Sequence, residues 1–167
     1  MKRISTIISI LLLLVTSAFA QNSSVFTRAG ISGLQVGYSF EPITRVNIPI
    51  SIGISSNFIE KKYNDFSVEV WPNYQLQRKN FRFPLGLMAG VKWVKTYDYS
   101  YAVFNYGFYS GVSYRFGRNE IGLNAGVKFG KRRYIIETQT SIGDISAYET
   151  YKENPLLLML TYSFKIK

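Results

Sequence analysis

Apolar residues alternate with polar or small ones along residues 101–116, which read YAVFNYGFYSGVSYRF. One set of alternate positions is mainly apolar and holds Ala102, Phe104, Tyr106, Phe108, Ser110, Val112, Tyr114 and Phe116. The other set holds Tyr101, Val103, Asn105, Gly107, Tyr109, Gly111, Ser113 and Arg115. Because successive side chains of a β-strand point to opposite faces, this period of two predicts one long strand with an apolar face.

The same period recurs in six further segments, at residues 33–40, 46–58, 66–76, 83–93, 121–129 and 156–166. Turn-forming or polar residues separate the segments, at residues 41–42, 61–65, 77–80, 96–100 and 117–120. Residues 131–154 are polar and weakly patterned, with room for one more strand at 134–140 or 145–151. The pattern therefore predicts one all-β domain with seven clear strands.

All charged residues within these segments lie on the second face. They are Glu69, Lys92, Arg115, Lys128 and Lys165. A soluble ligand-binding barrel would turn the apolar face inward, whereas a membrane barrel turns it to lipid. An interior of about eight strands is just wide enough to be filled by side chains. It could not hold every Phe, Tyr and Trp of the apolar face together with the Leu and Ile residues, so the volume favours the membrane barrel.

Tyr-x-Phe closes three of the predicted strands on the apolar face. Amphipathic rings at strand ends are typical of the aromatic girdle at a membrane interface. We expect such a girdle to consist of Tyr38, Phe40, Tyr114, Phe116, Tyr162 and Phe164. Because an open sheet edge has no hydrogen-bonding partner in hydrocarbon, the predicted fold is a closed antiparallel up-and-down transmembrane β-barrel of about eight strands.

The position of the eighth strand is open at this point. With eight strands, the extra one is expected between residues 131 and 154. The Tyr-x-Phe ends favour a different parity of the strand count. They would place the end of the first clear strand on the same side as the C-terminus, which requires an odd number of strands from the first clear strand to the last. Both conditions hold only if residues 23–31 form a separate short strand.

Residues 1–20 have the pattern of a signal peptide. Lys2 and Arg3 give a positive start, residues 7–15 form a short apolar core, and Ala18-Phe19-Ala20 is a small-x-small cleavage site. We expect signal-peptide-dependent export to the bacterial outer membrane, with residues 21–167 forming the barrel domain. The net charge of +10 favours anionic headgroups or polysaccharide over nucleic acid as partners, or serves solubility alone.

The chain resembles the small outer-membrane β-barrel proteins of Gram-negative bacteria, especially the outer membrane protein beta-barrel domain group. The resemblance rests on the leader ending Ala18-Phe19-Ala20, on Gly-rich alternating strands such as residues 122–129, and on the closing strand at residues 158–164. It implies the fold, the location and recognition of the last strand by the barrel assembly machinery. The sequence departs from the commonest form because three residues follow Phe164. The resemblance implies no functional residue.

The sequence contains no His and no Cys, which excludes nucleophiles activated by histidine and makes conventional zinc sites implausible. A Ser–Lys pair on the lumen face stays open, but no pair stands out. We expect no catalytic residue, no metal and no cofactor. Lys131, Arg132 and Arg133 could contact anionic headgroups, or form a solvated strand end.

A lumen charge cluster is predicted instead. Glu69 is the only inward carboxylate within a clear strand, and Lys92, Arg115 and Lys128 share its face. Because a lone carboxylate in a narrow lumen is costly to desolvate, we expect it to pair with at least one of them and to help plug the barrel.

The predicted function is a non-enzymatic structural or interaction role in the cell envelope, with outer-membrane lipid, lipopolysaccharide or an envelope protein as partners. The alternatives are a small-solute pore and, less favoured, a soluble periplasmic ligand-binding barrel.

Overall fold

The computed structural model describes residues 22–31, 33–56, 64–95, 100–140, 143–152 and 155–166. Within these ranges the strands are β1 (Ser23–Gly30), β2 (Gly33–Ile43), β3 (Val46–Ser56), β4 (Asn64–Val70), β5 (Asn73–Arg78), β6 (Phe81–Lys95), β7 (Ser100–Phe116), β8 (Asn119–Phe129), β9 (Lys131–Thr140), β10 (Gly143–Lys152) and β11 (Leu156–Lys165). No helix in the described ranges is long and apolar enough to cross a membrane.

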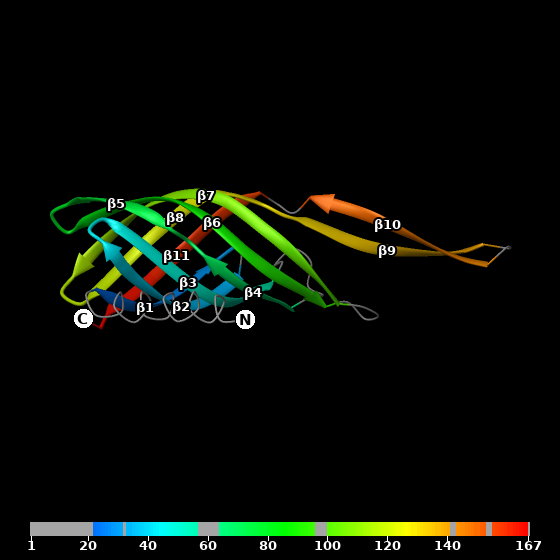
Figure 1. Ribbon diagram of the computed structural model, residues 1–167, viewed down its shortest axis with the longest axis horizontal. Helices are drawn as coiled ribbons and strands as arrows, with labels where there is room; N and C mark the ends of the chain where they lie inside the picture. Colours follow the sequence, from blue (N-terminus) through cyan, green and yellow to red (C-terminus); the bar gives the residue numbers. More distant parts are fainter. Residues whose placement is uncertain are drawn as a thin grey trace, which may run out of the picture.

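Nine of these strands close into a barrel (Figure 1). Pairing runs from β1 through β2 to β3, then through β4 and β5 to β6, β7, β8 and β11, and β11 pairs with β1. Every pairing is antiparallel. Because β4 and β5 share one position, the barrel has eight strand positions, and the predicted closed antiparallel up-and-down barrel of about eight strands is confirmed.

The break between β4 and β5 is caused by Pro72. Val70 pairs with Ile50 before the break, and Asn73 pairs with Asn47 after it. The pairing therefore advances by three residues on each side, and the register is the same before and after the break. Proline has no N–H to donate to the ladder. Its carbonyl still accepts the Leu87 N–H at 3.0 Å. The single strand predicted over residues 66–76 therefore corresponds to β4 and β5 together, which keep one register across a local break in the pairing.

The eighth strand of the barrel is β1, and its expected location between residues 131 and 154 was wrong. Those residues contribute β9 and β10, which pair with each other as a separate hairpin that extends beyond the barrel wall (Figure 1). In β1 the alternation is hard to recognise in the sequence. The outward residues Thr27 and Ala29 are small, while the inward Phe26 and Arg28 are large.

Three tight turns lie at one end of the barrel, which we call the turn end. Two-residue turns join β2 to β3 at Thr44-Arg45, β5 to β6 at Lys79-Asn80, and β7 to β8 at Gly117-Arg118. Arg45, Lys79 and Gly117 have φ values of 71°, 55° and 64°, as tight hairpins require. The break expected at residues 41–42 is an irregularity inside β2, not a turn.

The other end of the barrel carries the β9–β10 hairpin, and we call it the hairpin end. The start of β1 and the end of β11 meet at the opposite, turn end, where Ser24 pairs with Lys165. A small apolar core lies inside the barrel and consists of Trp71, Met88, Tyr109, Leu157 and Met159.

Candidate functional site

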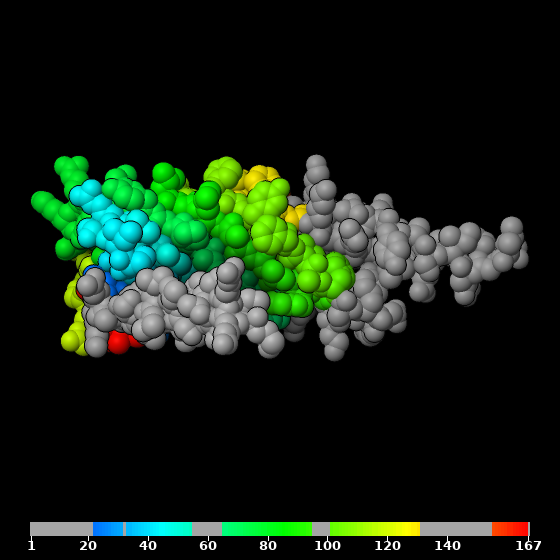
Figure 2. All heavy atoms as spheres, in the orientation of Figure 1, coloured from blue at the N-terminus to red at the C-terminus, as the bar shows by residue number. Residues whose placement is uncertain are grey.

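The outer face of the barrel is apolar, as the alternation predicts. Aliphatic side chains occupy its middle, and Leu87 is 65% exposed. Figure 2 shows part of the outer face formed by β3, β6 and β7, in cyan to light green, and the exposed side chains of these strands include Ile52, Leu87 and Phe104. The other exposed aliphatic residues include Val36, Ile50, Ile52, Leu85, Val112, Leu123, Leu158 and Leu160. A continuous exposed apolar band of this kind marks a surface that contacts another apolar phase.

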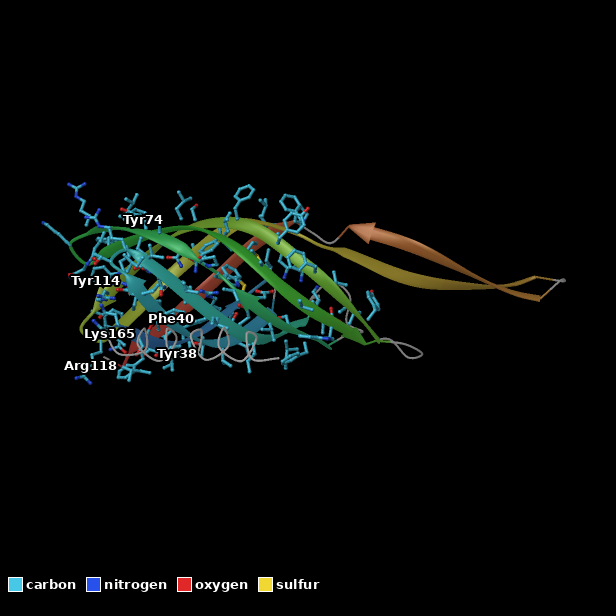
Figure 3. All side chains as sticks on the ribbon, in the orientation of Figure 1. Tyr38, Phe40, Tyr74, Tyr114, Arg118 and Lys165 are labelled. Carbon is cyan, nitrogen blue, oxygen red and sulfur yellow. The ribbon has the colours of Figure 1, made fainter. Side chains whose placement is uncertain are left out.

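An aromatic belt surrounds the turn end. All six predicted girdle residues lie there, because Phe40 pairs with Ser23, and Phe164 with Asn119 next to the β7–β8 turn. Figure 3 labels Tyr38, Phe40, Tyr74 and Tyr114 at this end, together with Arg118 and Lys165. Tyr74 and Phe81, also exposed, complete the belt and were missed, because neither belongs to a Tyr-x-Phe strand end.

Tyrosine hydroxyls of the belt bond to residues in or beside the turns. Arg45 donates to the Tyr74 hydroxyl at 3.3 Å, and the Tyr162 hydroxyl donates to Asn119 at 2.6 Å. The Tyr114 hydroxyl accepts from the Asn80 side-chain amide at 3.5 Å. The rings therefore have an apolar body against the band and a polar tip at the rim.

A second aromatic belt lies toward the hairpin end. Phe66 and Trp93 are 5.6 Å apart between ring centres, and so are Tyr106 and Phe129. Phe104 and Tyr114 belong to different belts and lie ten residues apart on β7. At about 3.3 Å per residue and a tilt of about 40°, that separation is roughly 25 Å, the height of the apolar band of an outer-membrane barrel.

Glu69 is the centre of a hydrogen-bond network inside the barrel. Its residue is 1% exposed. The carboxylate accepts from the Gln35 amide at 2.6 Å and from the Trp71 indole N–H at 3.0 Å, and Lys128 Nζ lies 3.4 Å away. Of the three cations considered for Glu69, Lys128 is the one that the structure pairs with it.

The other predicted lumen cations have different partners. Lys92 pairs with Asp65 at 3.7 Å, and Arg115 pairs with Glu120 at 3.5 Å near the turn end. The four expected residues therefore do not form one cluster. Asp65, Glu41 and Glu120 were assigned to turns from the sequence, but they lie in strands and face inward, because the strands continue beyond the part that alternates clearly.

A second layer of charge lies at the turn end. Arg82, which sequence reasoning missed, lies 2.9 Å from Glu41 and 3.6 Å from Glu120. It also donates to Gln75 at 2.8 Å. Arg82 sits just after a turn, at the edge of the alternating segment that begins at residue 83, so the pattern gave no sign of its direction.

Aromatic and thioether side chains fill the middle of the lumen. Trp71 is fully buried, and its ring lies 4.8 Å from that of Tyr109, edge to face. The Tyr109 hydroxyl donates to the Trp71 carbonyl at 3.0 Å. With Met88, Leu157 and Met159 and the Glu69 network, these rings form what we call the plug. The expected polar lumen therefore has an apolar centre.

Inward-facing glycines beside the plug leave room for its large side chains, because an added Cβ would clash with them. A Cβ on Gly86 would lie 2.9 Å from the Tyr109 ring and would clash with the Pro72 carbonyl oxygen, and a Cβ on Gly90 would lie 2.6 Å from Glu69 Cγ. On the other side of Tyr109, a Cβ on Gly126 would lie 2.9 Å from its Cβ. The Gly-rich inward positions thus lie beside large inward side chains of neighbouring strands.

The lumen is open on the turn-end side of the plug. Two cavities of about 50 Å³ each lie there and share Ser39, Asn47, Gln75, Glu120 and Ser163. Beyond them is a vestibule lined by Arg45, Lys79, Arg82, Arg115 and Lys165, with Glu41 as the carboxylate among its lining residues. Among the described residues, the turn-end side of the lumen is therefore a positively charged pocket that ends at the plug.

Two predicted elements cannot be placed. The signal peptide at residues 1–20 lies outside the described residues, and so do the side chains of Lys131, Arg132 and Arg133. Their roles stay predictions.

No protein-family model and no curated protein sequence matches the chain. Among solved structures, Neisserial surface protein A is 13% identical, with a TM-score of 0.48 over 87% of this chain and 94% of that one. The N-terminal β-barrel domain of Pseudomonas aeruginosa OprF is 14% identical, with a TM-score of 0.46 over 87% and 96%.

A major outer membrane protein from Thermus thermophilus is 11% identical, with a TM-score of 0.49 over 88% of this chain and all of that one. These likenesses concern the arrangement of strands. The chain itself is an eight-stranded antiparallel barrel.

Proposed function

We propose that this protein is a non-enzymatic outer-membrane β-barrel with a structural or interaction role in the cell envelope. The observation that carries the proposal is the apolar outer band between two aromatic belts, about 25 Å apart. A soluble barrel would expose this band to water, where it would drive association. The band therefore favours lipid over solvent as the surroundings of the wall.

The plug argues against the pore alternative. Trp71 and Glu69 are buried at the centre of the lumen, and hydrogen bonds join them to each other and to Gln35. An aqueous path would have to break this network and displace Met88 and Tyr109. We therefore propose that the closed barrel acts through its surfaces.

The orientation follows from the lengths of the connections. Outer-membrane barrels have short periplasmic turns and longer extracellular loops. We place the turn end in the periplasm and the β9–β10 hairpin outside. Export would depend on residues 1–20. Outer-membrane lipid and lipopolysaccharide would surround the wall of the barrel. The barrel assembly machinery would bind β11, and an envelope protein would bind at the hairpin end.

Cell fractionation tests the location. We expect the protein to remain with the outer membrane and to run differently on a gel when the sample is not boiled. Leu87→Ala, which keeps the band apolar, is the matched control for Leu87→Arg, which should reduce the fraction that shows the shift. Recovery of the folded protein in the soluble periplasmic fraction would contradict the location.

Planar-bilayer recordings test the closed lumen. The unmodified protein should give no large, steady channels, and Glu69→Gln should increase any residual conductance by weakening the plug. Large, steady channels in the unmodified protein would overturn the closed barrel in favour of a pore.

A further inference from the structure

Arg28 is a buried cation that the ion pairs of the lumen do not include. Its residue, on β1, is 4% exposed, and its guanidinium carbon lies 4.3 Å from the ring centre of Trp71 and 4.4 Å from that of Phe26. Each of the four lumen carboxylates lies within 3.7 Å of a lysine or of another arginine. Among the described residues Arg28 therefore forms no ion pair, and the charge of Glu69 acts on it only from a longer distance while being paired with Lys128.

Two donors of this guanidinium lack an acceptor. Nε and Nη1 are buried and have no hydrogen-bond partner within the described part of the chain. The rings of Phe26 and Trp71 attract the charge, but they do not accept the hydrogen bonds that the guanidinium donates in its own plane. Because a buried charged donor without a partner is costly, this arrangement calls for a negatively charged acceptor.

Arg28 lines one of the two cavities on the turn-end side of the plug. The cavity has a volume of about 50 Å³, and its polar lining includes Ser39, Asn124, Thr161 and Ser163. A water molecule needs about 10–15 Å³ measured in this way. The space therefore suits a small ion with a few waters and is too small for a sugar, a nucleotide or a peptide.

The approach to the cavity favours anions. Glu120 is the carboxylate among the lining residues, and Arg82 and Arg115 hold it at 3.6 and 3.5 Å. The vestibule beyond adds Arg45, Lys79 and Lys165 to these two arginines. A cleft lined by one sign of charge between low-dielectric walls concentrates ions of the opposite sign.

We propose that Arg28 and this cavity form a binding site for one small monovalent anion with the size and charge of chloride, which enters from the turn end. The anion lies against the guanidinium of Arg28, which lines the cavity, and neutralises the buried charge. Hydroxyl and amide groups of Ser39, Asn124 and Ser163 complete its shell, directly or through water.

Iodide quenching of tryptophan fluorescence tests the site. The chain has two tryptophans, Trp71 against Arg28 and the outward Trp93, so Trp93→Phe leaves one reporter beside the proposed site. In this variant, refolded into detergent micelles, we expect quenching that saturates with iodide and that chloride reverses at constant ionic strength. Acrylamide, a neutral quencher, should show no saturation.

Matched variants at Thr161 assign the effect to Arg28. Thr161 is the cross-strand neighbour of Arg28, so Thr161→Asp supplies a carboxylate from the protein itself. It should raise the half-saturating iodide concentration by about tenfold or more, while the neutral Thr161→Asn should leave it nearly unchanged. Arg28→Gln should abolish saturation in material that keeps its heat-modified mobility.

Quenching that rises in proportion to iodide and is equal in the parent, Thr161→Asp and Thr161→Asn would overturn the proposal and leave water as the only occupant of the cavity. Saturation that chloride does not reverse would overturn the assignment to a chloride-like anion. Because Thr161→Asp and Thr161→Asn differ only in charge, the test does not depend on whether Arg28→Gln folds.

Discussion

Removal of the Glu69 carboxylate should destabilise the barrel strongly. In Glu69→Ala, the Gln35 amide and the Trp71 indole lose their acceptor, at present 2.6 and 3.0 Å away, and Lys128 loses the counter-ion at 3.4 Å. Breaking a buried ion pair from one side costs about 3–5 kcal/mol, because the remaining charge is left uncompensated. We expect a loss of that size in the free energy of unfolding.

The reciprocal change should cost less. Lys128→Met removes the cation but leaves Glu69 with two neutral donors, so we expect a loss of about 1.5–3 kcal/mol. The double variant Glu69→Gln with Lys128→Met should be less destabilised than the sum of its two single changes, with a coupling energy of about 0.5–3 kcal/mol. The difference between the summed losses of the two single variants and the loss of the double variant would measure the interaction between the two side chains.

Urea unfolding in lipid vesicles, followed by the fluorescence of the buried Trp71 in a Trp93→Phe background, provides the assay. Ser67→Ala is the control, because Ser67 is also buried on β4 but makes only a 3.5 Å hydrogen bond to the Gly53 carbonyl. It should cost about 1 kcal/mol or less. A Glu69→Ala protein within about 0.5 kcal/mol of the parent, the range of ordinary surface changes, would refute the role given to the network.

Three further changes test the outer face, the plug and the closing strand. Leu87→Arg should cost roughly 2–4 kcal/mol in a lipid refolding titration if the site is near the midplane, and a cost equal to that of Leu87→Ala would contradict the assignment of faces. Trp71→Ala should cost about 3–5 kcal/mol and raise bilayer conductance above that of Tyr109→Phe; equal conductance in the two variants would count against the plug. Deletion of Tyr162 to Lys167 should leave a chain that fails to insert, since β11 then loses most of its pairing with β1; normal heat-modified mobility would rule this out.

The alternation predicts the barrel because, in a membrane barrel, each outward position within the lipid must be apolar. The pattern fades where this constraint ends. Glu41, Asp65 and Glu120 lie near strand ends beside turn-forming residues, so their inward direction could not be recognised from composition. The same holds for Arg82.

The plug and the Arg28 site were hidden for a different reason. Inward positions carry no rule about residue type, only a limit on total volume. Trp71 and Tyr109 are aromatic although they face inward, so the sequence alone does not distinguish them from outward aromatic residues. In β1, the large inward residues Phe26 and Arg28 break the expected alternation, so the strand could not be recognised. Which inward side chains contact one another depends on the register between neighbouring strands. Several of these neighbours, such as β1 and β11, are far apart in the sequence, so their register cannot be predicted from it.

The seam between β1 and β11 joins the earliest and latest parts of the barrel to be synthesised. Gly30 pairs with Met159, so one edge of β1 has no partner until nearly the whole domain has been made. An unpaired strand edge is a template for aggregation, and contacts this distant in sequence form slowly. The newly made chain should therefore need a holding factor that shields this edge, and variants that weaken the seam should show their defect first as lost yield during biogenesis, before any loss of stability in the finished barrel.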